Sequence, residues 1–242
     1  MKAMIFAAGL GTRLKHLTDR KPKALVEVQN KSLLEIAISK LSSFGFDDII
    51  VNVHHFSDQV IEFLEANKFD ANISISDESE NLLDTGGGLF KACDFFNKNE
   101  AFLIYNVDII SDIDLKKMYN SHNDSNALIT LAVRNRLTSR YLMFDDKENL
   151  AGWKNIKTAE TIMINQVKEE LISLAFSGIQ IVDPKIFELY NRNGKFSIID
   201  VLLELAKSHS IKAFIHDDDF WIDLGKPESL RYAENWLINN SL

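Results

Sequence analysis

The sequence predicts an α/β fold, in which helices flank a mixed, mainly parallel sheet, and three observations support this prediction. Short apolar runs typical of strands alternate with segments of helical periodicity over residues 1–125. Strand, helix, strand order requires parallel pairing through right-handed crossovers. No Gly-, Ser- or Pro-rich linker interrupts the 242 residues, so we expect a single domain, residues 1–242, with two lobes.

The first lobe, residues 1–125, carries the clearest alternation. Its expected strands are residues 3–8, 48–53, 72–76 and 101–107, and its expected helices are residues 32–44, 57–67 and 87–96. Ligands of such sheets lie beyond the carboxyl ends of the parallel strands. The segments that follow Ala8, Val53, Ser76 and Val107 are therefore the expected binding site.

The second lobe, residues 126–242, has more strands and fewer helices. Strands are expected at residues 127–135, 140–145, 150–155 and 174–182, and helices at residues 183–191, 197–208 and 228–240. This pattern predicts a mixed sheet laid against the first one.

Composition excludes several classes of protein. A net charge of −8 argues against nonspecific binding to nucleic acid or to an anionic membrane, because both require an excess of Lys and Arg. The amino-terminal stretch MKAMIFAAG lacks the apolar length of a signal peptide or a membrane helix, so we expect a cytoplasmic protein. Cys93 is the only cysteine, which excludes an internal disulfide. A homo-oligomer is left open.

A glycine loop follows the first expected strand, in the segment FAAGLGTRLKHLTDRKPKAL at residues 6–25. Gly9 and Gly11 allow backbone N–H groups to face a phosphate. The loop lacks the Gly-Lys-Ser/Thr of a Walker motif, and it has Leu14 where a dinucleotide fingerprint requires a third glycine. The alternative is a tight turn with no ligand.

The same segment collects positive charge in an otherwise acidic protein. Five Lys and Arg residues stand against one acid, Asp19. Because no helix is expected before Ser32, a helix dipole cannot hold the anion, and we expect side chains to do so. Arg13 and Lys23 are the candidates.

Two carboxylates stand at the ends of apolar runs. Asp108 ends the run FLIYNVD, and Asp223 follows another run beside a glycine turn. Mg²⁺ prefers oxygen ligands and bridges phosphates, so the pair is a candidate magnesium site. Alternatively, Asp108 forms an Asx turn that ends its strand, and the acidic run at 217–219 is interpreted as a solvated turn.

A second glycine group, LLDTGGGL at residues 82–89, opens a helix after the third strand. Three glycines would allow a flat ligand such as a nucleobase to lie against bare backbone.

These motifs together resemble those of the sugar-phosphate nucleotidyltransferases. The segment from Ala8 to Arg13, followed by Lys21-Pro22-Lys23-Ala24-Leu25, is similar to the signature of that family, and the resemblance runs from residue 1 to about residue 227. It implies a Rossmann-like fold and a glycine loop that wraps a triphosphate. It assigns catalytic roles to Arg13 and Lys23, and substrate-binding roles to Gly9, Leu10, Gly11 and Thr12.

The resemblance also assigns the remaining site. The sequences around Asp108 and Asp223 look like the family's two segments that bind Mg²⁺, although Val107 stands where serine or glycine is common. The implied substrate-binding residues are Asp84, Thr85, Gly86 and Gly87 on the base side, Ser177 and Gly178 toward the sugar, and Asn106 in the segment that ends at Asp108. Lys154 and Lys157 stand where many relatives have a Glu-Lys-Pro element, and they are candidates for the sugar's phosphate; both are alternatively solvent-facing strand lysines.

The resemblance implies an enzyme that joins a nucleoside triphosphate to a sugar 1-phosphate and releases pyrophosphate. UTP with N-acetylmuramic acid 1-phosphate, or GTP with mannose or heptose 1-phosphate, are the expected substrates, which points to nucleotide sugars for the cell envelope. One alternative is a regulatory subunit that binds sugar nucleotides without turnover, and the retained carboxylates argue against it. A dinucleotide-dependent oxidoreductase is disfavoured by the missing third glycine.

Overall fold

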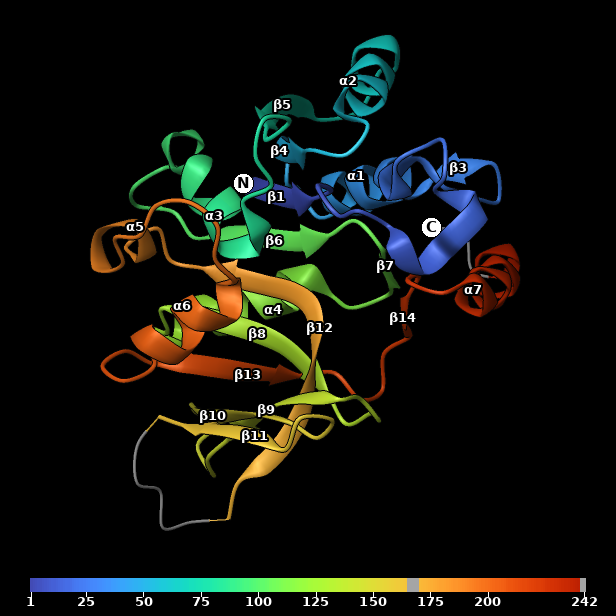
Figure 1. Cartoon of the computed structure of the whole chain (residues 1–242). Coiled ribbons are helices and arrows are strands. Elements are labelled where there is room, and N and C mark those ends of the chain that lie inside the picture. The colour runs from blue at the N-terminus through green and yellow to red at the C-terminus, as the bar shows by residue number, and fades with distance from the viewer. Residues whose placement is uncertain (165–169, 240–242) are drawn as a thin grey trace.

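The computed structural model describes residues 1–164 and 170–239. Its main sheet consists of β1 (Lys2–Phe6), β4 (Asp48–Val53), β5 (Asn72–Asp77), β6 (Phe102–Asn106), β8 (Ile129–Arg134), β9 (Arg140–Phe144), β10 (Leu150–Asn155), β11 (Glu160–Met163), β12 (Ile172–Val182) and β13 (Ile211–Ile215). The path through the sheet is β11-β10-β9-β12-β6-β1-β4-β5, and β8 joins β13 to β12 (Figure 1).

The strands of the first half of the chain pair in parallel within this sheet. β1 pairs in parallel with both β4 and β6, and β4 pairs in parallel with β5. The helices α1 (Leu33–Ser43), α2 (Ser57–Ala66) and α3 (Asp84–Lys91) lie between successive strands in the sequence. This arrangement confirms the predicted α/β, Rossmann-like fold and brings the carboxyl ends of β1 and β6 to one edge.

The second half continues the same sheet, so the prediction of a separate sheet laid against the first was wrong. β12 pairs antiparallel with β6, β8 and β9. β12 has 11 residues, which is enough for all three pairings. It bends where its pairing with β8 shifts register, between Phe176 and Gln180. In Figure 1 it curves from the centre of the molecule to the lower strands.

Several elements differ from the sequence prediction. The helix α4 (Leu115–Ser125) was not predicted because only three of its residues, Leu115, Met118 and His122, are buried, which leaves little apolar periodicity. The helix expected over residues 87–96 is divided into α3 and a short 3-10 helix, η3 (Cys93–Phe95). The short strands β7 (Ile109–Ser111) and β14 (Trp221–Asp223), which pair with each other, were also not predicted.

The remaining elements complete the outer layers. They are the β-hairpin β2 (Glu27–Val28) and β3 (Lys31–Ser32), the 3-10 helices η1 (Thr12–Leu17) and η2 (Lys23–Leu25), and the helices α5 (Ile186–Leu189), α6 (Ile198–Leu205) and α7 (Pro227–Asn239). The last helix was predicted over 228–240, and residue 240 lies outside the described residues. Within the described ranges, no helix has the length and apolar character needed to cross a membrane.

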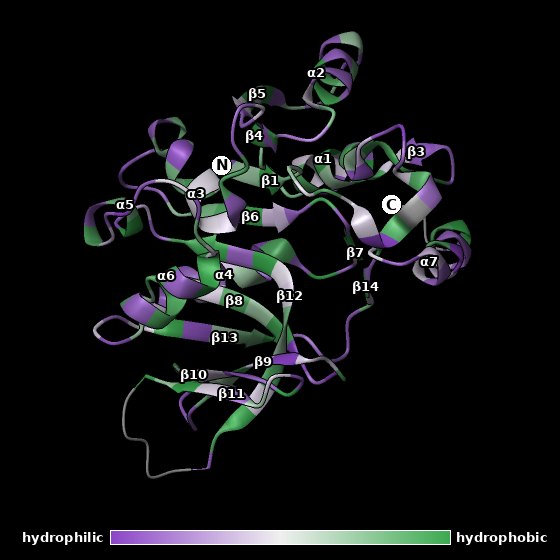
Figure 2. Ribbon diagram, in the orientation of Figure 1, coloured by the Kyte–Doolittle hydropathy of each residue, from purple (hydrophilic) through white to green (hydrophobic). Residues whose placement is uncertain are grey.

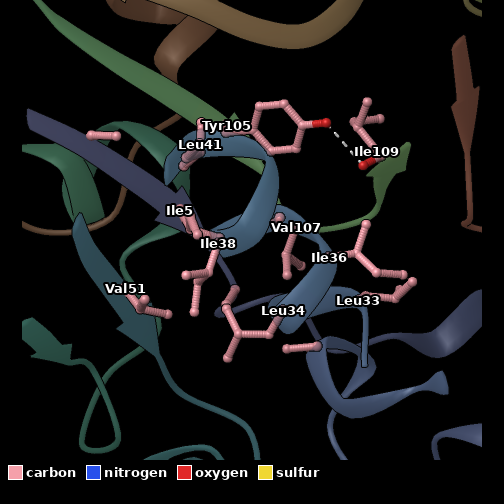
Figure 3. Close-up of a cluster of buried hydrophobic side chains, with 14 of the residues drawn as sticks. Ile5, Leu33, Leu34, Ile36, Ile38, Leu41, Val51, Tyr105, Val107 and Ile109 are labelled. Carbon is pink, nitrogen blue, oxygen red and sulfur yellow. Dashed lines mark hydrogen bonds between the residues drawn. The ribbon is translucent and has the colours of Figure 1, made fainter. Parts of the chain in front are cut away.

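The hydrophobic core between α1 and the sheet holds in place the edge of the sheet at which the candidate site forms. Buried side chains of α1 pack against β1 and β4, among them Ile38 on the helix and Ile5 and Val51 on the strands (Figure 3). Tyr105, on β6, is also buried here, and its hydroxyl donates a hydrogen bond to the Ile109 carbonyl (3.1 Å). This bond closes the turn that joins β6 to β7. Across the molecule, hydrophobic residues lie mainly along the central strands (Figure 2).

Two buried histidines make the folded state sensitive to acid. Burial lowers the pKa of His122 and of His216 to about 4. The unfolded chain binds these protons near pH 6.5, so the stability from the two neutral rings is present above about pH 6.5 and is lost as the pH falls toward 4. We expect the free energy of unfolding to fall by up to about 3 kcal/mol per histidine across this window.

Urea denaturation at pH 7, 5.5 and 4.5 measures this loss. His122→Gln should flatten the dependence on pH, whereas His209→Gln, at a partly exposed histidine, should leave it unchanged. The role of His122 is wrong if both variants keep the slope of the parent.

Candidate active site

The predicted glycine loop lines a cavity at the carboxyl ends of β1 and β6. The cavity, of about 430 Å³, is bordered by Gly9, Leu10, Gly11, Thr12, Arg13, Lys23, Asn52, Asp84, Thr85, Asn106, Asp108, Lys195 and Gly225, among others. Gly11 adopts a φ of +66°, which favours glycine, and its carbonyl accepts a hydrogen bond from the Leu14 N–H (2.9 Å). The loop and both predicted cations therefore face one space.

A helical segment begins sooner than expected. Residues 12–17 form the 3-10 helix η1, whereas we expected no helix before Ser32. Six residues are too few to carry a readable periodicity, which is why the sequence did not reveal this segment.

Lys23 and Asp108 form an ion pair at the floor of the cavity. Lys23 belongs to η2 and is only 8% exposed, and its Nζ contacts Oδ2 of Asp108. Asp108 is the second residue after β6, and the Val107 N–H before it donates a hydrogen bond to the Phe6 carbonyl of β1 (3.2 Å). Two neighbouring parallel strands thus place the lysine's partner at the cavity.

Arg13 and Asp223 form a second, more open pair. Nη1 of Arg13 lies 3.7 Å from Oδ2 of Asp223, and both side chains are at least a third exposed. The guanidinium of Arg13 packs against Gly225, where a Cβ would lie 2.5 Å from Cζ. Any larger residue at 225 would displace the arginine.

Pairing between β7 and β14 brings the two carboxylates together from distant parts of the sequence. Asp223 stands in register with Ile109, and the Leu224 N–H donates a hydrogen bond to the Asp108 carbonyl (2.8 Å). Oδ1 of Asp223 accepts the Gly225 N–H (2.7 Å). The carboxylates therefore stand on adjacent backbone segments at the cavity edge.

This pair fits a divalent cation shared with phosphate groups. Oδ2 of Asp223 has only the longer contact with Arg13, and Asp108 is paired through Oδ2 alone. Among the described residues, no group of three or more His, Cys, Asp and Glu side chains could hold a metal by itself. Two carboxylates with substrate oxygens suit Mg²⁺, which completes its coordination with phosphates and water.

The base-side motif is only partly at the cavity. Asp84 and Thr85 line it, and the Thr85 hydroxyl accepts the Ile198 N–H (3.0 Å) at the start of α6. Gly86 and Gly87 are buried in α3, where a Cβ would meet residues 194–196 at 2.2–2.9 Å. Close packing of helix and loop explains these two glycines without a ligand, and their contact with a base stays a prediction.

Three residues at this site were missed by sequence reasoning. Lys195 lines the cavity from a loop with no periodicity to identify it. Oδ1 of Asn52, on β4, accepts the Ala7 N–H of the glycine loop (2.8 Å), and its Nδ2 donates to Oε1 of Glu78 (2.7 Å). Glu78 is 1% exposed, and burial raises its pKa. The amide in the apolar strand DIIVNV was a signal, because a buried polar side chain requires partners.

The glycine at 178 lets β12 reach the cavity edge. Gly178 has a φ of +77°, and a Cβ there would lie 2.8 Å from Nδ2 of Asn106. Ser177 is fully buried: its hydroxyl is bonded to Nε2 of His216 (2.7 Å), and its carbonyl accepts the Trp221 indole N–H (2.8 Å). Ser177 thus fixes Trp221 beside Asp223.

Gly178→Ala should destabilise the fold by about 1–3 kcal/mol, because it adds the cost of positive φ to a clash with Asn106. Gly45→Ala is a matched control: its φ is +81°, but its Cβ would meet only Met1 Cε at an ordinary 3.6 Å. Urea denaturation of both variants should show the larger loss at 178. Equal losses would mean that the contact with Asn106 contributes nothing.

The two candidate lysines of the second lobe lie outside the set of residues that borders the cavity. Nζ of Lys154 lies 5.5 Å from the centroid of the Tyr141 ring. Lys157 is exposed in the turn after β10, and its N–H donates to Oδ1 of Asn155 (3.0 Å). A role for either lysine with the sugar phosphate stays a prediction.

Comparison with known proteins identifies the family of the chain. Residues 2–240 match the family model described as nucleotidyl transferase. The chain is 30% identical to D-glycero-alpha-D-manno-heptose 1-phosphate guanylyltransferase from Campylobacter jejuni, over 99% of this chain and 100% of that protein. It is 29% identical to N-acetylmuramate alpha-1-phosphate uridylyltransferase from Caulobacter vibrioides, over 96% and 95% of the two chains.

Solved structures give the same result. HddC from Yersinia pseudotuberculosis aligns with a TM-score of 0.79 and 25% identity, over 98% of this chain and 99% of that one. Some relatives are longer, and the chain spans 60% of the length of one of them. Because the family model covers nearly all of the sequence, the chain belongs to the nucleotidyl transferase family.

Proposed function

We propose that this chain transfers a nucleotidyl group from a nucleoside triphosphate to a sugar 1-phosphate and releases pyrophosphate. The observation that carries the proposal is the pairing of two cations with two carboxylates at one cavity edge, Lys23 with Asp108 and Arg13 with Asp223. A site that only binds a nucleotide needs the cations, but it does not need two adjacent carboxylates for a metal.

The proposed reaction is one in-line displacement. An oxygen of the sugar phosphate forms a bond to the α-phosphorus, and the bond from that phosphorus to the β-phosphate oxygen breaks, with its electron pair leaving on pyrophosphate. The attacking oxygen is already ionised near neutral pH, so the protein supplies no nucleophile or base. Arg13 and Lys23 stabilise the negative charge that develops on the phosphates.

Asp108 and Asp223 would hold a Mg²⁺ ion in this proposal. When bound, the ion would neutralise phosphate oxygens and help to align them. Lys23 would then compete with the ion for Asp108, so its ammonium group is expected to turn from the carboxylate to the phosphates when substrate and metal enter. The glycine loop would bind the triphosphate through its backbone N–H groups.

In this proposal the two lobes bind different substrates. We assign the nucleotide to residues 1–125 and the sugar phosphate to residues 126–242, with Lys195 reaching the nucleotide side from the second lobe. The relatives named above suggest UTP with N-acetylmuramic acid 1-phosphate or GTP with heptose 1-phosphate, and GTP with mannose 1-phosphate is the third candidate pair. Such products would be made in the cytoplasm and serve the cell envelope.

A substrate panel tests the proposal. Purified protein is incubated with Mg²⁺, each of UTP, GTP, CTP, ATP and dTTP, and a set of sugar 1-phosphates, and pyrophosphate release is measured. We expect one strong pair, with activity abolished by EDTA. A protein that binds a nucleotide but releases no pyrophosphate with any pair would contradict the proposal and favour a regulatory subunit.

Gel filtration of the same preparation decides whether the protein is a homo-oligomer.

A further inference from the structure

Asp223 interacts with two arginines, and only one of them belongs to the glycine loop. Arg13 forms the ion pair described above. The second is Arg136, in the loop after β8: burial lowers the pKa of its guanidinium, and the charge of Asp223 raises it, so the two groups lie within electrostatic reach. Arg13 serves the triphosphate in the proposed function, so Arg136 is the arginine near Asp223 that has no assigned role.

Arg136 is held in place by the residues that build the second half of the site. Its guanidinium stacks on the Trp221 ring, with Cζ 4.5 Å from the ring centroid. Its Nη2 donates a hydrogen bond to the carbonyl of Phe176 (3.0 Å), one residue before Ser177. Trp221 is itself fixed by the Ser177 carbonyl. A stacked and hydrogen-bonded guanidinium loses little further entropy when it binds a ligand.

The guanidinium of Arg136 is partly buried, and some of its N–H donors have no acceptor among the described residues. Its Nε is buried and has no hydrogen-bond partner among the described residues. Within residues 1–164 and 170–239, the only hydrogen bond of its side chain is the one that it donates to the Phe176 carbonyl, and no carboxylate lies within ion-pair distance. A desolvated charge with unused donors is costly, and a planar guanidinium matches the oxygens of a phosphate.

Arg136 and the lysines that the sequence suggested for this task all lie outside the residues that border the cavity. Lys154 lies over Tyr141, whereas Arg136 is stacked on Trp221, two residues before Asp223. The acceptor's phosphate must reach the triphosphate at the cavity, and Asp223 lies beside Arg13, which borders that cavity. An anion held by Arg136 would therefore lie next to the reacting groups.

We propose that Arg136 binds the phosphate of the acceptor sugar 1-phosphate and holds it beside Asp223. This inference rests on the proposed function, and it names the residue that recognises the second substrate. Trp221 positions the guanidinium. The Phe176 and Ser177 carbonyls of β12 accept hydrogen bonds from Arg136 and Trp221, respectively, and hold both side chains in place. Arg136 is thus an acceptor-binding residue, distinct from the triphosphate-binding Arg13 and Lys23.

Steady-state kinetics with the active pair from the substrate panel test this inference. Arg136→Gln should raise KM for the sugar 1-phosphate about 10- to 100-fold, the range for loss of a charge-assisted contact, with KM for the nucleoside triphosphate changed less than about twofold. In the reverse reaction, KM for the nucleotide sugar should rise, and KM for pyrophosphate should not. Arg140→Gln is the matched control, at an exposed arginine four positions along the chain.

Arg136→Lys helps to separate a loss of binding from a folding defect, since lysine keeps the positive charge but lacks the planar guanidinium. It should raise the acceptor KM by a smaller factor than Arg136→Gln, and its melting temperature should be no lower than that of Arg136→Gln. An acceptor KM equal to that of Arg140→Gln in both variants would overturn the inference. So would a rise of equal size in both substrate KM values, because a structural defect would produce it.

Direct binding separates this inference from the proposed function. Calorimetric titration of the wild-type protein with the panel's sugar 1-phosphates and with inorganic phosphate needs no turnover. Binding that Arg136→Gln weakens at least tenfold, in a protein without transferase activity, would overturn the proposed function and retain the anion site. A wild-type protein that binds none of these phosphates would overturn the inference.

Discussion

Lys23→Ala is expected to lower kcat about 100- to 1000-fold, because removal of one preorganised charge from a site that stabilises developing negative charge has effects of this size. The lysine is 8% exposed and sits against Asp108, so its charge acts in a partly desolvated place. The affinity for the nucleoside triphosphate should fall much less, since Arg13 and the glycine loop remain. Single-turnover rates and equilibrium binding of the nucleotide measure the two effects separately.

Lys21→Ala is the control for this experiment. Lys21 belongs to the same basic segment but is exposed and pairs with Glu27 at 3.1 Å. It should change kcat less than about twofold, as expected for a surface ion pair. Equal turnover in Lys23→Ala and the parent would refute the catalytic role of Lys23, and a drop of equal size in Lys21→Ala would show that the overall charge of the segment matters instead.

The first half of the fold was predictable because local signals and long-range pairing agree there. Each strand is a short apolar run, and β1, β4 and β5 are each followed in the sequence by a helix with an apolar face, which favours parallel pairing through right-handed crossovers. The second half was harder, since most of its strands pair antiparallel, β8 and β13 pair in parallel, and the pairing is out of sequence order. Whether β12 pairs with β6 or stacks on it depends on side-chain packing across the sheet, which an apolar run such as LAFSGIQIV does not specify.

The site residues of the first half were likewise easier to predict than those of the second half. Arg13, Lys23 and Asp108 lie near glycine turns and strand ends in the first half, where residue type and position point to phosphate chemistry. Asp223 was found through its motif, but its place beside Asp108 depends on the pairing of two three-residue strands. Arg136 carried no signal at all: a single arginine after a strand becomes informative only when its ring partner, its carbonyl acceptor and its unused donors are known.

Asp223→Asn should lower kcat/KM about 1000-fold at millimolar Mg²⁺, the upper part of the range for loss of one electrostatic group at a phosphoryl-transfer site. Asparagine keeps the shape of the side chain and an oxygen that can accept the Gly225 N–H, so the loss reports on charge. The concentration of Mg²⁺ that gives half the maximal rate should rise in the variant. Asp218→Asn, in the exposed turn before β14, is the control and should behave like the parent.

The double variant Asp108→Asn/Asp223→Asn tests whether the two carboxylates act together. If both hold one ion, either single change already removes most of its contribution, and the double variant should be little slower than the slower single variant. Multiplication of the two single effects would show that the carboxylates act independently, and one shared metal site would then be wrong. Since Asp108 also partners Lys23, the comparison is cleanest with Lys23 unchanged and at saturating concentrations of both substrates.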